Sequence, residues 1–227
     1  AFRWRRRQTA LGVQAQLQPV RQVAAIRLDD LQNIDEQKEA IVRNTRQFVE
    51  GLPANNVLLT GSRGTGKSSL IKACLNEWAP QGLRLIEVDK DDLVDLPDIV
   101  ELVSSRPERF IVFCDDLSFE AGEGEYRVLK SVLDGSLERA PDNVLLYATS
   151  NRRHIVKERF SDRDLRDDIH EDDSLQEKLA VADRFGLTIT FPFPNQDFYL
   201  KVVKHLAERH RICLDEGEII RRALQWE

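Results

Sequence analysis

The feature that most constrains this chain of 227 residues is the segment 61–68, which reads Gly-Ser-Arg-Gly-Thr-Gly-Lys-Ser. It matches the pattern G-x-x-x-x-G-K-[ST] at every fixed position. Residues 56–60 before it predict a buried strand, and apolar residues recur at helical spacing after it. A strand, a glycine-rich loop and a helix in this order indicate a loop that surrounds a phosphate group. A chance match in a glycine-rich turn would not explain both flanks.

Each fixed position of this loop has a chemical task. The glycines let backbone N–H groups turn inward, and the helix N-terminus adds partial positive charge. Lys67 is expected to reach the β- and γ-phosphates, and the Ser68 hydroxyl to ligate Mg²⁺. The sequence therefore predicts a site for ATP or ADP with Mg²⁺. The nucleotide-binding residues are expected to be Gly61, Ser62, Arg63, Gly64, Thr65, Gly66, Lys67, Ser68 and Ser69.

A second motif follows at residues 110–116, where an apolar run ends in Asp115 and Asp116. This pattern is typical of a buried parallel strand whose carboxyl end faces a ligand. Asp115 is placed to hold Mg²⁺ through water, and Asp116 to orient the water that attacks the γ-phosphate. A strand that enters an acidic turn is the alternative, and the phosphate loop upstream disfavours it.

Residues 143–151 predict a further strand that ends in a polar residue. In P-loop proteins with an extra strand between the loop strand and the acidic strand, that strand delivers a polar side chain toward the γ-phosphate. Asn151 is the candidate for this role. Arg152 and Arg153 follow directly, and a solvated turn explains them equally well.

The whole pattern predicts an α/β P-loop domain with a five-stranded parallel sheet flanked by helices. The strands are expected at residues 56–60, 83–89, 110–116, 143–151 and 187–191. The helices are expected at residues 34–49, 68–78, 97–103, 125–139 and 174–183.

The chain divides into three expected parts: an N-terminal arm at 1–32, the α/β domain at 33–193 and a small helical lid at 194–227. The apolar residues of the arm show no clear helical or strand periodicity. Its basic and aromatic start could touch nucleic acid, although an arm packed on the domain explains it more simply. Residues 157–173 are dense in both charges and predict a surface insertion.

Composition limits the remaining classes of function. The net charge of -6 does not favour binding of the chain as a whole to nucleic acid or to an anionic membrane. The three cysteines lie in apolar runs without metal-ligand spacing, which favours reduced thiols in the cytoplasm. No apolar run reaches the roughly 18 residues of a spanning helix, so we expect no membrane contact. The absence of methionine favours a fragment of a longer chain, and hence a truncated lid.

With these motifs the chain resembles the AAA+ ATPases over nearly its whole length. The resemblance rests on residues 31–38 as the segment bordering the adenine, 61–68 as Walker A, 110–116 as Walker B, Asn151 as sensor 1 and 183–186 as the box with the arginine finger. The Asp-Asp ending and the Arg-Phe-Gly box are similar to the bacterial replication initiator and helicase-loader branch. Residues 148–154 look most like an uncharacterised bacterial family of AAA+-like ATP-binding proteins.

The resemblance implies slow hydrolysis of ATP, with Lys67, Asp116, Asn151 and Arg184 as the catalytic residues. It also implies a homo-oligomer in which Arg184 acts in trans on the nucleotide of a neighbouring subunit. The chain would then be a switch or remodeller of a macromolecular partner, either a protein or a nucleic acid.

Two features depart from the superfamily pattern. Residues 90–95 stand where a threading unfoldase has an aromatic pore loop, and the sensor 2 arginine is expected beyond residue 227. A P-loop kinase remains an alternative, although the lid arginines do not cluster as a kinase lid requires. A nucleotide-binding scaffold that does not hydrolyse ATP is the second alternative.

Overall fold

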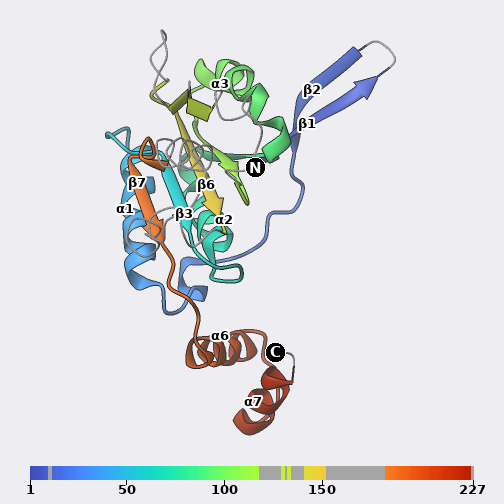
Figure 1. Cartoon of the computed structure of the whole chain (residues 1–227), viewed down its shortest axis with the longest axis vertical. Helices are drawn as coiled ribbons and strands as arrows, with labels where there is room; N and C mark the ends of the chain where they lie inside the picture. Colours follow the sequence, from blue (N-terminus) through green and yellow to red (C-terminus); the bar gives the residue numbers. More distant parts are fainter. Residues whose placement is uncertain (10–11, 118–128, 131, 134–140, 152–181, 226–227) are drawn as a thin grey trace, which may run out of the picture.

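A mixed sheet lies at the centre of the computed structural model, which describes residues 1–9, 12–117, 129–130, 132–133, 141–151 and 182–225 (Figure 1). Seven strands pair in the order β2-β1-β4-β5-β6-β3-β7. The strands are β1 (Phe2–Thr9), β2 (Gly12–Pro19), β3 (Val57–Thr60), β4 (Leu83–Val88), β5 (Arg109–Cys114), β6 (Val144–Ser150) and β7 (Leu187–Thr190). The five strands from β4 to β7 in this order are parallel, so the predicted parallel α/β sheet is confirmed.

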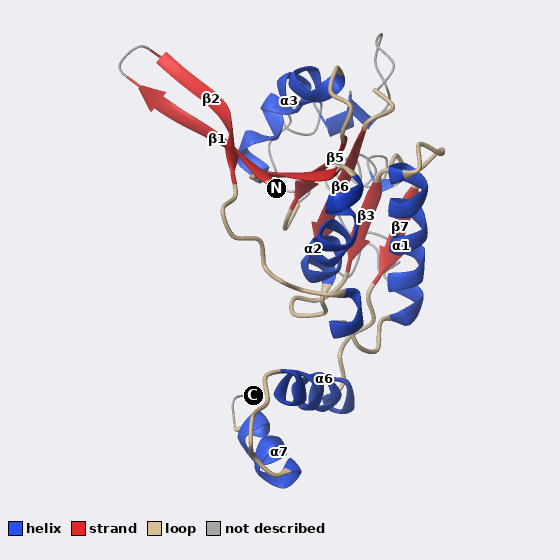
Figure 2. Ribbon diagram, turned by 180° about the vertical axis from the view of Figure 1, so that it is seen from behind, coloured by secondary structure: helices blue, strands red, loops and turns tan. Residues whose placement is uncertain are grey.

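Helices cover both faces of the parallel strands, which explains why these strands are mostly apolar. The helices are η1 (Leu28–Asp30), α1 (Asp35–Val49), α2 (Lys67–Trp78), η2 (Ala79–Gln81), η3 (Lys90–Asp95), α3 (Leu96–Ser104), α6 (Gln196–Arg209) and α7 (Glu216–Leu224). Along β3, Val57 and Leu59 pack on the face covered by α1 and α2, whereas Leu58 packs on the face covered by α3 (Figure 2). The sheet thus separates two apolar clusters.

A buried polar network fixes α1 to the sheet. Tyr147 of β6 is fully buried, and its hydroxyl lies 3.0 Å from Asn44 Nδ2 and 2.9 Å from Thr45 Oγ1. Asn44 also exchanges two hydrogen bonds with the backbone of Asn55, the residue that leads into β3. Burial raises the pKa of the Tyr147 hydroxyl, so this group keeps its proton.

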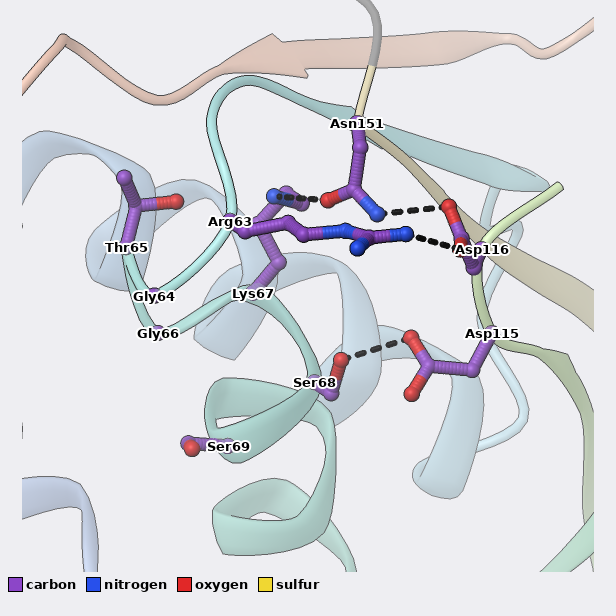
Figure 3. A pocket seen from close by; sticks show the side chains of 10 residues that line it. All are labelled: Arg63, Gly64, Thr65, Gly66, Lys67, Ser68, Ser69, Asp115, Asp116 and Asn151. Atoms are coloured by element: carbon purple, nitrogen blue, oxygen red, sulfur yellow. Dashed lines mark hydrogen bonds and ion pairs between the residues drawn. The ribbon is translucent and has the colours of Figure 1, made fainter. Parts of the chain in front are cut away.

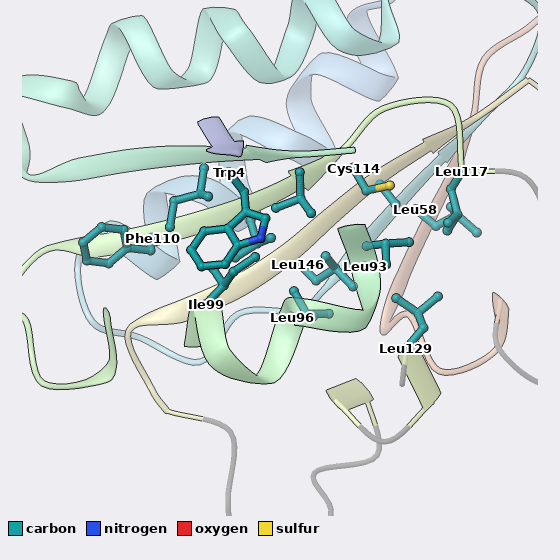
Figure 4. Close-up of a cluster of buried hydrophobic side chains, with 14 of the residues drawn as sticks. Trp4, Leu58, Leu93, Leu96, Ile99, Phe110, Cys114, Leu117, Leu129 and Leu146 are labelled. Atoms are coloured by element: carbon teal, nitrogen blue, oxygen red, sulfur yellow. The ribbon is translucent and has the colours of Figure 1, made fainter. Parts of the chain in front are cut away.

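The N-terminal segment differs from the expected arm, because most of it is regular structure. Strands β1 and β2 form an antiparallel hairpin, in register from Phe2 opposite Pro19 to Thr9 opposite Gly12. The start of β1 also pairs in parallel with β4. Trp4 is only 5% exposed and packs against α3, and its indole N–H donates to Asp95 Oδ2 at 2.9 Å (Figure 4). The expected sheet of five strands is therefore extended to seven.

Two helices, α6 and α7, follow the sheet and lie apart from it in Figure 1. Asn195 and Asp215 cap them, each accepting a hydrogen bond from a backbone N–H three residues on. Arg209 of α6 forms an ion pair with Asp30 and donates to Ala25 O at 2.9 Å. The helices predicted after the sheet are therefore present, and α6 contacts the segment before α1.

Some expectations lie outside the described residues. They include the charged insertion at 157–173 and nearly all of the helix expected at 174–183; of the helix expected at 125–139, residues 129–130 and 132–133 are described and are helical. None of the helices in the described part of the chain combines the length and apolar character needed to cross a bilayer.

Candidate nucleotide site

The candidate site lies where three parallel strands end. β3 leads into the loop at 61–66, β5 ends next to Asp115, and β6 ends next to Asn151. Because β6 pairs with both β3 and β5, these three chain segments meet at one edge of the sheet. They enclose a pocket of about 300 Å³ (Figure 3). It is lined by Arg63, Gly64, Thr65, Gly66, Lys67, Ser68, Ser69, Asp115, Asp116 and Asn151.

Two glycines determine the path of the loop. A Cβ on Gly61 would lie 2.7 Å from the carbonyl oxygen of Phe191, so only glycine lets the loop pass this close to the end of β7. Gly66 has φ 92 and precedes α2, and no side chain caps this helix. The first N–H groups of α2 have no acceptors within the helix, so they provide donors for an anion at this end.

Lys67 lies at the base of the loop and is 5% exposed. Its Nζ donates to Gly61 O at 2.8 Å, to Ser62 O at 2.7 Å and to Asn151 Oδ1 at 3.1 Å. Burial lowers the pKa of the ammonium, while the carboxylates of Asp115 and Asp116 oppose this shift. A phosphate held by the loop would therefore meet a cation that is already positioned and partly removed from water.

The two predicted metal ligands lie together. The Ser68 hydroxyl donates to Asp115 Oδ1 at 2.6 Å. A hydroxyl and a carboxylate oxygen match the preference of Mg²⁺, which typically takes one or two protein ligands and completes its shell with phosphate and water. Among the described residues, no group of three or more His, Cys, Asp or Glu side chains is arranged to hold a metal ion.

Asp116 is held on both sides. Its Oδ1 accepts from Asn151 Nδ2 at 2.5 Å, and its Oδ2 accepts from the Arg63 guanidinium at 3.1 Å. The backbone of Asp116 has φ 57, a conformation that aspartate tolerates better than most residues. Since Arg63 is 80% exposed in this pair, the ion pair adds little stability. The pair links the phosphate loop to the segment that follows β5.

Thr149 is a site residue that the sequence analysis missed. It is 1% exposed, donates to Asp115 Oδ1 at 2.6 Å, and accepts from the backbone N–H of Asp116 at 2.9 Å. A single hydroxyl thus holds the carboxylate of Asp115 and the backbone of Asp116. The register of the two strands could have identified Thr149. Cys114 of β5 pairs with Ala148 of β6, so Asp115 and Thr149, which follow them, are neighbours.

Arg184 does not join this pocket. It precedes β7, and the parallel pairing of Val57 with Leu187 places it at the amino end of the sheet, opposite the phosphate loop. The neighbouring Gly186 approaches Asn55 so closely that a Cβ would lie 2.5 Å from Asn55 Oδ1. Arg152 and Arg153 lie outside the described residues.

Comparisons with known proteins agree with this architecture. A family model described as "Protein of unknown function (DUF815)" matches residues 1–227. A search of curated proteins found no match. Among solved structures, the Thermotoga maritima RuvB Holliday junction branch migration motor is 16% identical, with a TM-score of 0.56 over 88% of this chain and 59% of that chain. The replication initiator DnaA bound to AMPPCP and single-stranded DNA is 19% identical, with a TM-score of 0.58 over 88% and 60%.

The Aeropyrum pernix ORC1 protein in complex with DNA is also similar, at 12% identity with a TM-score of 0.56 over 81% of this chain and 53% of that chain. The chain thus spans between 53% and 60% of the length of these three structures. At such identities the likeness concerns the fold alone, and all three are AAA+ ATPases. The chain belongs to the DUF815 family and has the fold of the AAA+ ATPases.

Proposed function

We propose that this chain binds ATP with Mg²⁺ and hydrolyses the ATP as an AAA+ ATPase that switches or remodels a macromolecular partner. The supporting observation is the convergence of three groups at one pocket: the uncapped N-terminus of α2, the buried Lys67 ammonium, and the pair formed by Ser68 and Asp115. Together they provide donors and a cation for phosphate oxygens and oxygen ligands for a divalent ion.

Each side chain has a distinct task in this proposal. The loop and Lys67 hold the β- and γ-phosphates, and Ser68 and Asp115 hold Mg²⁺, which would neutralise charge on the phosphate oxygens. Asp116 orients the attacking water. Its two present partners leave capacity for this, because a carboxylate offers about four lone-pair positions. Asn151 keeps Asp116 and Lys67 in a fixed relation.

Turnover is expected to be slow. Many related ATPases carry glutamate where this chain has Asp116, and aspartate is one methylene shorter. The carboxylate therefore reaches the water less well, and we expect turnover below the typical range of about 1 to 1000 per second.

We further propose that Arg184 completes the site of a neighbouring subunit in a homo-oligomer. Its position at the amino end of the sheet supports this, because the pocket of its own chain lies at the opposite end. An arginine supplied in trans typically accelerates hydrolysis by about 10³ to 10⁵. The DnaA and ORC1 structures contain DNA, which makes nucleic acid one candidate class of partner beside protein.

Three of the four described arginines of the lid support this proposal over a P-loop kinase. A kinase lid needs free arginines that grip the donor phosphates. Here Arg209 is paired with Asp30, and Arg221 and Arg222 both bind Glu218. A scaffold that binds nucleotide without hydrolysis uses the same loop, so only a measurement of turnover separates it from an ATPase.

Calorimetric titration with ATP and Mg²⁺ tests nucleotide binding. Lys67→Ala should lose about tenfold or more in affinity, because a charge-assisted hydrogen bond is removed, and should remain folded. Lys201→Ala, an exposed lysine of α6, is the matched control and should bind normally. Equal affinity in the two variants would refute the site. ADP and free phosphate, each measured with and without acceptor alcohols, then separate the three functions. An ATPase forms both without an acceptor, a kinase forms ADP and a phosphorylated acceptor but no free phosphate, and a scaffold forms neither.

A further inference from the structure

The hairpin of β1 and β2 presents a basic face that the nucleotide site does not use. We propose that this face binds duplex DNA. The hairpin face is defined by Arg3, Arg5 and Arg7 of β1 and by Gln14, Gln16 and Gln18 of β2. The inference concerns a surface remote from the pocket, and it holds whether or not the chain hydrolyses ATP.

The register of the hairpin brings these six side chains together. Arg3 lies opposite Gln18, Arg5 opposite Gln16, and Arg7 opposite Gln14. Because side chains alternate along a strand, all six belong to one face of the ribbon. The apolar pair of Trp4 and Leu17 belongs to the other face, which packs on the domain. The hairpin face is therefore polar throughout.

The charge of the hairpin opposes that of the whole chain. Residues 1–19 contain four arginines and no acidic residue, although the chain has a net charge of -6. Arg3 is paired with Glu87, and Arg6, on the opposite face, lies 3.8 Å from Asp95. Arg5 and Arg7 are exposed and form no ion pair with any residue that the structure describes. Two guanidinium groups are thus available to an external anion.

Single-stranded nucleic acid matches this face poorly. Proteins that bind single strands stack the bases on exposed aromatic rings. Phe2 and Trp4 are the only aromatic residues among residues 1–19, and both pack against the apolar core. Trp4 also uses its indole N–H for Asp95. The Trp4 ring therefore belongs to the domain interior (Figure 4), and the partly buried Phe2 packs against the same cluster.

Duplex DNA matches the same face well. The major groove of B-DNA admits a two-stranded β-ribbon, whereas the deep, narrow groove of A-form RNA does not admit side chains that read it. Arginine binds phosphate and guanine, and glutamine binds adenine. Alternate residues of a strand recur every roughly 6.8 Å, which corresponds to about two base-pair steps along one DNA strand.

The hairpin is also mounted so that it can reach a duplex. Its base is joined to the sheet by the pairing of Phe2 with Ile86 and Arg3 with Glu87 and by the buried Trp4. Beyond this base the two strands extend away from the sheet and from α1 and α2 (Figures 1 and 2). The core therefore anchors the base of the hairpin, and the hairpin face lies outside the core.

Fluorescence anisotropy of a labelled duplex of about 20 base pairs, a length of roughly two helical turns, tests the proposal without nucleotide present. Arg5→Gln combined with Arg7→Gln should weaken binding about tenfold or more at low salt. The dependence of log K on log salt should also become less steep by about 1.8, because two phosphate contacts are lost. Arg5→Lys combined with Arg7→Lys should keep the salt dependence, since the charge remains.

The matched control is Arg43→Gln combined with Arg46→Gln, which makes the same change in net charge at two exposed positions of α1. This control should bind the duplex as the unaltered chain does. All variants should keep their nucleotide affinity, so the DNA proposal can fail while the ATPase proposal stands. Equal loss in the hairpin and α1 variants, tighter binding to single-stranded DNA or duplex RNA of the same length, or absence of duplex binding by the unaltered chain would overturn the inference.

Discussion

Replacement of Thr149 by valine tests the geometry of the candidate site most directly. Valine keeps the shape of this buried side chain and removes only the hydroxyl that donates to the Asp115 carboxylate and accepts from the backbone N–H of Asp116. The lost hydrogen bond to the charged Asp115 contributes about 1.5 to 3 kcal/mol, and a buried N–H of Asp116 without an acceptor costs about 1 to 3 kcal/mol. Because the site is partly open to water, we expect a total near the lower end, about 2 to 4 kcal/mol.

In a chain of this size such a loss lowers the melting temperature by at least about 4 °C. Thermal unfolding followed by circular dichroism measures this effect, and calorimetry should show weaker Mg²⁺-dependent binding of ADP because Asp115 is less well positioned. Thr149→Ser keeps the hydroxyl and should retain the Mg²⁺ dependence. Thr188→Val, an exposed position of β7, should change stability by less than about 0.5 kcal/mol. The reasoning fails if the valine and serine variants of Thr149 melt and bind alike.

Three further predictions follow from the same geometry. Asp115→Asn should weaken Mg²⁺-dependent nucleotide binding in calorimetry, whereas Asp116→Asn should keep binding and lose phosphate release; equal losses of binding would reverse these roles. Specific ATPase activity should rise with protein concentration, and mixing Arg184→Ala with Lys67→Ala should restore some activity; no rescue on mixing would return Arg184 to a structural role. Tyr147→Phe should lower the free energy of unfolding in urea by about 1 to 3 kcal/mol, since two α1 side chains lose their buried partner; an unchanged value would contradict that network.

The parts of the site that the sequence predicts are those specified locally. The phosphate loop depends on glycines and a helix start within a few residues, so the pattern at 61–68 is sufficient. Asp115 and Asn151 are separated along the chain, yet each follows an apolar strand. The carboxyl ends of parallel strands share one edge of the sheet, so their meeting near Lys67 could also be predicted.

Thr149 and the hairpin depend on information that the sequence does not display. Thr149 is one polar residue in a strand, and only the pairing of β6 with β5 places its hydroxyl between the Asp115 carboxylate and the backbone N–H of Asp116. In β1, the three consecutive arginines Arg5, Arg6 and Arg7 occupy both faces and conceal the alternation of a half-buried strand. Burial of Trp4 requires α3, which is distant in sequence.

The amide of Asn151 explains how the loop and the acidic strand act as one site. Its oxygen accepts from the Lys67 ammonium and its N–H₂ donates to the Asp116 carboxylate, so a cation and an anion determine its orientation from opposite sides. An aspartate in this place would repel Asp116, and an apolar side chain would remove one hydrogen bond from each of the two charged groups. A neutral side chain with both a donor and an acceptor is therefore required here. Any movement of Lys67 toward a bound phosphate changes the hydrogen bonding of the residue that holds Asp116.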